Sequence, residues 1–195
     1  VGPTGSGKTS LLRWIADNSN GYRTIYISKP PLQISEFVYI VNDNFKRRFL
    51  WFIPNIKNPY QIPAFLHKKK ERVVFLIDEA HESEIDVLEW LRVLSDQVEN
   101  LSVVISALPS FEEQLKDKLE TLRKRIAARI EVLSLTKEEM REMIKMRIEG
   151  SGGTGIEPLD EAVIEALYEK TGGFPREVIR ICNDLVMRAV SDGKE

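Results

Sequence analysis

The chain has 195 residues, of which 43% are hydrophobic and 30% charged, a composition typical of a globular protein and not of a disordered one. Its 28 Lys and Arg residues are balanced by 30 Asp and Glu residues, which excludes a global basic field, so any nucleic-acid contact must use a local patch. Cys182 is the single cysteine, so an internal disulfide is excluded and a reducing cytoplasmic setting is expected; no apolar run reaches membrane-spanning length.

The chain opens with a glycine-rich stretch, Gly2-Pro3-Thr4-Gly5-Ser6-Gly7-Lys8-Thr9, which is followed by Ser10 and a helical apolar pattern. The spacing G-x-x-x-x-G-K-[ST] is that of a P-loop, whose backbone N–H groups converge on phosphate. We expect residues 2–10 to contact the nucleotide, Lys8 to reach the β- and γ-phosphates and Thr9 to bind Mg²⁺. Only Val1 precedes the loop, so the strand that normally feeds it is missing from this numbering, and we infer a trimmed fragment of a longer chain.

Residues 23–28 are rich in β-formers and predict a strand, and residues 36 to about 49 predict a helix capped by Ser35. Two basic stretches follow. The first, at 46–52, mixes Lys and Arg with aromatic residues and is either a nucleic-acid patch or, as we favour, a solvated helix end above core aromatics. The second, at 67–70, ends a short helix, where cations are favourable, and a DNA-facing role is the alternative.

A second motif lies at 72–79. The run Arg72-Val73-Val74-Phe75-Leu76-Ile77 is continuous and apolar after its first residue, as expected of a strand buried in a parallel sheet, and it ends in Asp78-Glu79. Ligands of open α/β sheets bind at this end of the strands. Together with the P-loop the pattern predicts a Walker B motif, with Asp78 in the Mg²⁺ shell and Glu79 orienting or deprotonating the attacking water.

The remainder of the first domain alternates helix and strand. An amphipathic helix is expected around 85–98 and a buried strand at 101–106, whose final Ser106 is either a γ-phosphate sensor or a turn starter. A helix at 111 to about 128, broken near Glu120, precedes a last strand at 129–133. From residue 135 the pattern is helical only, so we place a nucleotide-binding core at 1–134 and a lid at 135–195.

The lid pattern contains clear helix boundaries. A capping box at 136–139 opens a helix to about 148, a glycine-rich loop follows at 150–155, and a second helix runs to Lys170. In Thr171-Gly172-Gly173-Phe174-Pro175-Arg176, glycine ends one helix and proline opens the next. Cys182 falls on the apolar face of that last helix, which predicts a core position and not a reactive thiol.

Through these motifs, nearly the whole chain resembles an AAA+ ATPase. The narrower signals are LRKRIAARIEVLSLTKEE at 122–139 and TGGFPREVIRICNDL at 171–185, which are similar to ExeA-type secretion ATPases and to the origin-recognition and initiator clade. The resemblance implies an α/β P-loop NTPase fold, with a parallel sheet flanked by helices and followed by a small all-α lid. It also implies ATP or ADP with Mg²⁺ as ligands.

The resemblance further implies roles for arginines. Arg176 corresponds to sensor 2, which reaches from the lid to the γ-phosphate. The arginine finger, supplied to a neighbouring subunit, precedes the last core strand, and Arg125 is our first choice and Arg129 our second. Ser106-Ala107-Leu108 is a poor match to the polar sensor 1 of the family. A finger in trans implies a homo-oligomer whose hydrolysis depends on assembly.

We therefore expect an assembly-coupled ATPase that acts in DNA metabolism, with double-stranded DNA as a possible partner. The alternatives are a nucleotide-dependent switch and a secretion or signalling ATPase that acts without DNA. Asp78-Glu79-Ala80-His81 also matches the DEAH motif of superfamily 2 helicases, but a helicase needs a second RecA-like domain, and a small helical region follows here. We rank that alternative lower and interpret His81 as a local hydrogen-bonding residue.

Overall fold

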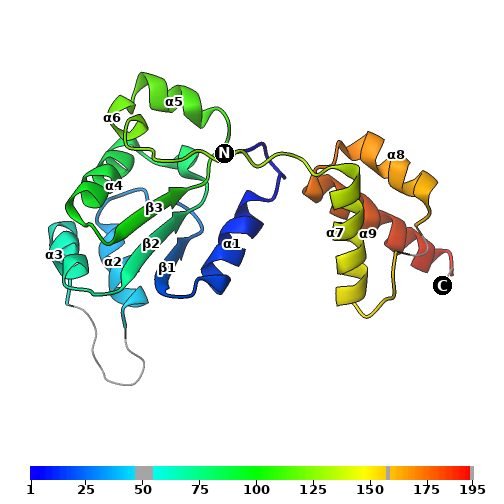
Figure 1. The fold of residues 1–195 in the computed structure, drawn as a ribbon, viewed down its shortest axis with the longest axis horizontal. Coiled ribbons are helices and arrows are strands. Elements are labelled where there is room, and N and C mark those ends of the chain that lie inside the picture. Colours follow the sequence, from blue (N-terminus) through cyan, green and yellow to red (C-terminus); the bar gives the residue numbers. More distant parts are fainter. Residues whose placement is uncertain (47–54, 157–158, 194–195) are drawn as a thin grey trace. The chain divides into compact units, whose positions relative to one another are not determined.

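The computed structural model describes residues 1–46, 55–156 and 159–193 (Figure 1). The chain forms two compact units, and the division does not follow the sequence strictly. The first unit contains Val1 and Lys8–Ile130, and the second contains Gly2–Gly7 and Glu131–Glu195. The aromatic part of the basic stretch at 46–52 lies outside the described residues, so the nucleic-acid interpretation of that stretch stays a prediction.

A three-stranded parallel sheet forms the centre of the first unit. Its strands are β1 (Tyr22–Ile27), β2 (Arg72–Ile77) and β3 (Leu101–Ile105), arranged in the order β1-β2-β3. The register pairs Ile27 with Ile77 and Ile77 with Ile105, so the three strands end side by side. Whatever follows each strand is therefore brought to one edge of the sheet, where ligands of such sheets bind.

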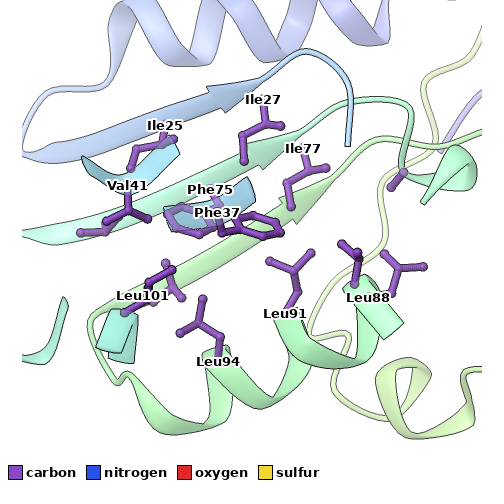
Figure 2. Close-up of a cluster of buried hydrophobic side chains, with 14 of the residues drawn as sticks. Ile25, Ile27, Phe37, Val41, Phe75, Ile77, Leu88, Leu91, Leu94 and Leu101 are labelled. Atoms are coloured by element: carbon purple, nitrogen blue, oxygen red, sulfur yellow. The ribbon is translucent and has the colours of Figure 1, made fainter. Parts of the chain in front are cut away.

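Helices cover one face of this sheet and enclose the main core (Figure 2). They are α2 (Glu36–Asn44), α3 (Ile62–His67), which follows the short 3₁₀ helix η1 (Pro59–Gln61), and α4 (Ile85–Gln97). The ring of Phe37 stacks on Phe75 with centroids 6.1 Å apart and approaches Trp90 at 4.6 Å. Because side chains alternate along a strand, one set of strand residues faces these helices. The set comprises Ile25, Ile27, Val73, Phe75, Ile77 and Leu101.

Helix α1 (Lys8–Asn18) packs against the opposite face, where Leu12 is buried. A hydrogen bond joins β1 to α1, because the Thr24 hydroxyl donates to the carbonyl of Ala16 over 3.1 Å. The expectation of a fully buried strand at 101–106 is wrong. β3 lies at the edge of the three-stranded sheet, and Ser102 and Val104 are exposed on it.

At the other end of the strands, where β2 and β3 begin, Asn100 hydrogen-bonds to several neighbouring segments. Its side-chain amide donates to the carbonyls of Leu66, Lys69 and Glu71 at 3.3, 3.0 and 2.9 Å. Its own carbonyl accepts from the N–H of Val73 over 2.8 Å. One side chain therefore links the end of α3, the turn after it and the start of β2 to the start of β3.

The segment after β3 corrects the sequence analysis. The helix expected at 111–128 is two short helices, α5 (Phe111–Asp117) and α6 (Glu120–Arg123), with the break where it was expected. Residues 129–133 do not form the expected strand. A strand requires a hydrogen-bonded ladder with a neighbour. One bond to this segment runs from the amino group of Val1 to the carbonyl of Ile130, at 2.7 Å, and it belongs to no ladder.

Three helices build the C-terminal part of the second unit: α7 (Lys137–Gly150), α8 (Glu161–Thr171) and α9 (Pro175–Ser191). The predicted capping box is confirmed, because the Thr136 hydroxyl and the Glu139 side chain each accept from the other's backbone N–H. Gly172 ends α8 in the left-handed region and Pro175 opens α9. These helices enclose a second small core of Met140, Ile144, Ile164, Leu167 and Val178.

Two smaller expectations, on the helix after Ser35 and on Cys182, are tested by the same structure. Ser35 precedes α2 but its side chain makes no capping hydrogen bond, and the helix ends at Asn44, before the expected end near residue 49. Cys182 packs half-buried against the second core, as expected. Among the described residues, no helix is both long and apolar enough to cross a membrane.

Candidate nucleotide-binding site

The glycine-rich loop forms a tight turn that leads into α1. The N–H of Ser6 donates to the carbonyl of Pro3 over 3.3 Å, and Gly5 and Gly7 have φ values of 83° and 99°, which side chains rarely tolerate. A Cβ built at Gly7 would meet no atom within 4 Å, so the backbone is open there. The Ser6 hydroxyl is buried and has no hydrogen-bond partner among the described residues. An open backbone beside an orphaned hydroxyl fits a loop that contacts a ligand.

Asp78 is the most enclosed acidic group described at this edge of the sheet, with only 1% of its surface exposed. The Thr9 hydroxyl donates to its Oδ2 over 2.6 Å, a distance typical of a hydrogen bond to an ionised carboxylate. The Tyr26 hydroxyl, on β1, donates to the same oxygen over 3.3 Å, and the N–H of Glu79 donates to Oδ1 over 3.0 Å. Lys8, the first residue of α1, is buried in the same unit.

Tyr26 is a site residue that the sequence analysis missed. It lies near the end of a strand that was assigned only a structural part, and its register partner is Leu76, two residues before Asp78. The available signal was the parallel pairing itself: a large polar side chain near the end of β1 must lie near the end of β2. Tyr26 restrains the Asp78 carboxylate from the neighbouring strand.

Glu79 has an unusual backbone conformation. Its φ of 53° makes it the only non-glycine residue in the left-handed region among the described residues. Backbone bonds on both sides fix it, from Asp78 N–H to the carbonyl of Ile27 (2.9 Å) and from Ala80 N–H to the carbonyl of Ser106 (2.8 Å). Such a conformation costs about 1–3 kcal/mol and is found most often at functional sites. The sharp turn carries the chain from β2 into the short 3₁₀ helix η2 (Ala80–Glu82).

The side chain of His81 turns back toward Glu79. Its Nε2 lies 3.4 Å from Oε2 of Glu79, while Glu82 approaches Lys29 at 3.7 Å. Ligand atoms of Glu79, His81 and Glu82 all lie within 4.8 Å of one another. The Glu79 carboxylate therefore has His81 as a close neighbour, and the interpretation of His81 as a local hydrogen-bonding residue stays a prediction.

Ser106 follows β3 directly. Its N–H donates to the carbonyl of Ile77 over 2.8 Å, and its side chain is buried with no hydrogen-bond partner among the described residues. The position one residue past the strand end, at the same edge as Asp78, is that of a candidate phosphate sensor. An orphaned buried hydroxyl is consistent with that use and also with a purely structural turn.

The two candidate finger arginines are exposed and paired with acidic groups of their own chain. Arg125 Nε lies 3.3 Å from Asp96, and Arg129 Nη1 lies 2.8 Å from Glu112. The side chain of Arg125 is 62% exposed to solvent and that of Arg129 is 46% exposed. Exposed ion pairs of this kind contribute only about 0–1 kcal/mol, so either arginine can exchange its partner at little cost.

In the second unit, Arg176 contacts the glycine-rich loop. Its N–H donates to the carbonyl of Gly5 over 3.4 Å, and a Cβ built at Gly5 would lie 3.1 Å from Cβ of Arg176. Arg176 opens α9 behind Pro175, so the Gly-Gly-Phe-Pro-Arg sequence sets its place. The absence of a side chain at Gly5 allows this close approach.

Comparison with known proteins decides the family. The family model described as "AAA domain" matches residues 1–115, which is more than half of the chain. The chain belongs to the AAA domain family. Its parallel sheet and flanking helices are those expected of an AAA domain, and the predicted fold class is confirmed.

Solved structures of Cdc6 and ORC proteins share this fold. Cdc6p from Pyrobaculum aerophilum is similar with a TM-score of 0.73 and 16% identity, over 100% of this chain and 55% of that one. ORC2 from Aeropyrum pernix, in ADPNP and ADP complexes, matches at 0.69 with 12% identity, over 99% and 57%. ORC1 from the same organism, in complex with DNA, matches at 0.59 with 17% identity, over 96% and 53%. The AAA domain thus resembles the origin-recognition clade, as predicted.

Among curated proteins, an uncharacterised HTH-type transcriptional regulator of Methanocaldococcus jannaschii is 22% identical over 163 residues. The alignment covers 80% of this chain and 37% of that protein. The AAA domain described here therefore spans little more than half the length of the structural relatives above and about a third of the curated one.

Proposed function

We propose that this AAA domain is a Mg²⁺-dependent ATPase that binds ATP and ADP through residues 2–10. The observation that carries the proposal is the 2.6 Å contact between Thr9 and Asp78, which are 69 positions apart in the chain. A hydroxyl and a carboxylate so close together are suitable oxygen ligands for one hard cation. The open backbone at Gly7 and the orphaned hydroxyl of Ser6 support phosphate binding by the loop.

The proposed chemistry divides among few residues. Lys8 neutralises the β- and γ-phosphates, and Thr9 with Asp78 holds Mg²⁺, which supplies further charge neutralisation when bound. Glu79 accepts the proton of the attacking water. Phosphoryl transfer needs mainly positioning and charge, so a strained but firmly anchored backbone at Glu79 suits this role.

Arginines complete the proposal. The contact between Arg176 and Gly5 supports a sensor 2 role, in which the guanidinium reports the γ-phosphate to α9. Arg125 or Arg129 acts as the finger for a neighbouring subunit, so turnover rises on assembly. Arg125→Ala is expected to abolish the assembly-dependent part of turnover, and Arg129→Ala is the matched control. If Arg129→Ala alone produces that loss, the assignment moves to Arg129, and if neither does, the finger lies elsewhere.

The primary test measures ATP binding and turnover together. Lys8→Ala is expected to lose binding, whereas Glu79→Gln is expected to bind ATP and to lose turnover by about 10²–10⁴, the usual contribution of a general base. Glu79→Gln with wild-type turnover would contradict the role of Glu79. Wild-type binding without turnover would favour the nucleotide-dependent switch.

We further propose that the protein acts in DNA metabolism. The support comes from its relatives: one solved structure is an ORC1 protein in complex with DNA, and the curated relative is named as an HTH-type transcriptional regulator. The test is ATP turnover of the full-length protein with and without double-stranded DNA, with the oligomeric state followed in the same samples. Turnover and assembly that ignore DNA would favour a secretion or signalling ATPase.

A further inference from the structure

His81 and Glu79 form a side-chain pair that the proposed chemistry does not use. The two nearest atoms, Nε2 and Oε2, are 3.4 Å apart, which is a polar contact longer than the usual N–H···O hydrogen bond. The imidazole side chain is only 17% exposed, whereas the Glu79 side chain is 40% exposed. The imidazole of His81 therefore has less room to move than the carboxylate of Glu79.

The other ring nitrogen indicates which one carries the proton. His81 Nδ1 is buried and has no hydrogen-bond partner among the described residues. A proton on Nδ1 would leave a buried N–H unsatisfied and turn the Nε2 lone pair toward a carboxylate. A proton on Nε2 instead faces the Glu79 carboxylate, 3.4 Å away. The Nε2–H tautomer is therefore the one that this environment favours.

The backbone of Glu79 is fixed by its neighbours, but its side chain has three rotatable bonds and is partly in water. A general base works only when its carboxylate is held in the productive orientation, and a base is commonly oriented by a third group. Thr9, Tyr26 and the N–H of Glu79 all donate to Asp78, whereas the imidazole of His81 faces the carboxylate of Glu79.

We propose that His81 is a positioning residue that orients the Glu79 carboxylate for hydrolysis; the proposal rests on the proposed role of Glu79 as the base. His81 touches no substrate in this scheme and acts only through Glu79. Its removal should therefore lower kcat and leave ATP affinity unchanged, whereas general damage to the site would alter both.

The kinetic test compares three variants. His81→Ala is expected to lower kcat on the order of tenfold with KM for ATP within about twofold, the size expected for the loss of one polar contact that orients a charged group. His81→Gln, whose amide N–H reaches a similar point, should restore most of kcat. In a Glu79→Gln background, His81→Ala should add no further loss. An unchanged or raised kcat in His81→Ala, or an additive loss in the double variant, would overturn the proposal.

A second measurement tests the contact of His81 with Glu79 independently of the role of Glu79 as the base. The sequence has two histidines, and His67 is exposed at the end of α3, so His67→Gln leaves a single imidazole to observe by ¹⁵N NMR. At pH 8 we expect the Nε2–H tautomer, and a mixture of tautomers in Glu79→Ala. The Nδ1–H tautomer would overturn the proposal. If Glu79→Gln hydrolyses ATP normally while the Nε2–H tautomer is found, the contact is real and the base role is what fails.

Discussion

Replacing Thr9 with valine removes one hydroxyl from the candidate site and keeps the size and branching of the side chain. The lost bond is the 2.6 Å contact with Oδ2 of Asp78, an oxygen that also accepts from the Tyr26 hydroxyl at 3.3 Å. A hydrogen bond to a charged group contributes about 1.5–3 kcal/mol. Valine and threonine have similar helix propensities, so little else changes in α1.

We therefore expect Thr9→Val to lower the free energy of unfolding by about 2 kcal/mol, which for a chain of this size corresponds to about 4–8 °C in Tm. Urea unfolding without nucleotide or Mg²⁺ isolates this effect. Tryptophan fluorescence follows the unit that holds Thr9, because the three tryptophans of the sequence lie within residues 8–130.

Thr9→Ser is the matched control, because serine keeps the hydroxyl and should retain most of the stability. The same pair tests the proposed metal ligand: Thr9→Val should weaken Mg²⁺-dependent nucleotide binding, and Thr9→Ser should not. A valine variant as stable as the wild type, within about 0.5 kcal/mol, would refute the reasoning, because the contact would then carry no net energy.

Phe75→Ala should lower the free energy of unfolding by about 3–5 kcal/mol in the same urea assay, because Phe75 is fully buried; a loss under 1 kcal/mol would contradict the packing. In thermal melts, Gly173→Ala should destabilise the second unit far more than Gly152→Ala. Both glycines have positive φ, so both substitutions strain the backbone. A Cβ at Gly173 would also lie 2.0 Å from the carbonyl oxygen of Leu135, whereas one at Gly152 would meet nothing within 4 Å. Equal melting of the two would contradict this. Burial raises the pKa of the Cys182 thiol, so its alkylation at pH 8 should be slower than that of free cysteine and accelerate at higher pH; a rate equal to free cysteine would show an open thiol.

The parts of the fold that follow from local pattern were predictable. The apolar run at 72–77 identified the central strand and placed Asp78 at its end, and the capping box at 136–139 fixed the start of α7. These signals are local, because burial and capping depend on a few neighbouring residues. The expected strand at 129–133 was wrong because a strand also depends on a partner, which composition does not reveal.

The finer geometry of the candidate site could not be predicted. The bond from Tyr26 to Asp78 depends on the register of two strands 50 residues apart, and a shift by one residue would turn Tyr26 to the other face. The contact of His81 with Glu79 depends on a left-handed backbone that sequence rules do not assign to glutamate. Roles for Arg125, Arg129 and Arg176 remain predictions, since they concern a bound nucleotide or a second subunit.

The three carbonyl bonds of Asn100 have a genetic consequence. These bonds help to fix the register of β2 from the start of the strand, and the register sets the position of Asp78 at its other end. A substitution of Asn100 changes no candidate nucleotide-binding residue, yet it weakens the anchoring of β2, the strand that precedes Asp78. Because a ligand stabilises the folded state that binds it, ample nucleotide would mask the defect at low temperature. Asn100 is therefore a position at which to look for temperature-sensitive alleles that a screen of the nucleotide site would never return.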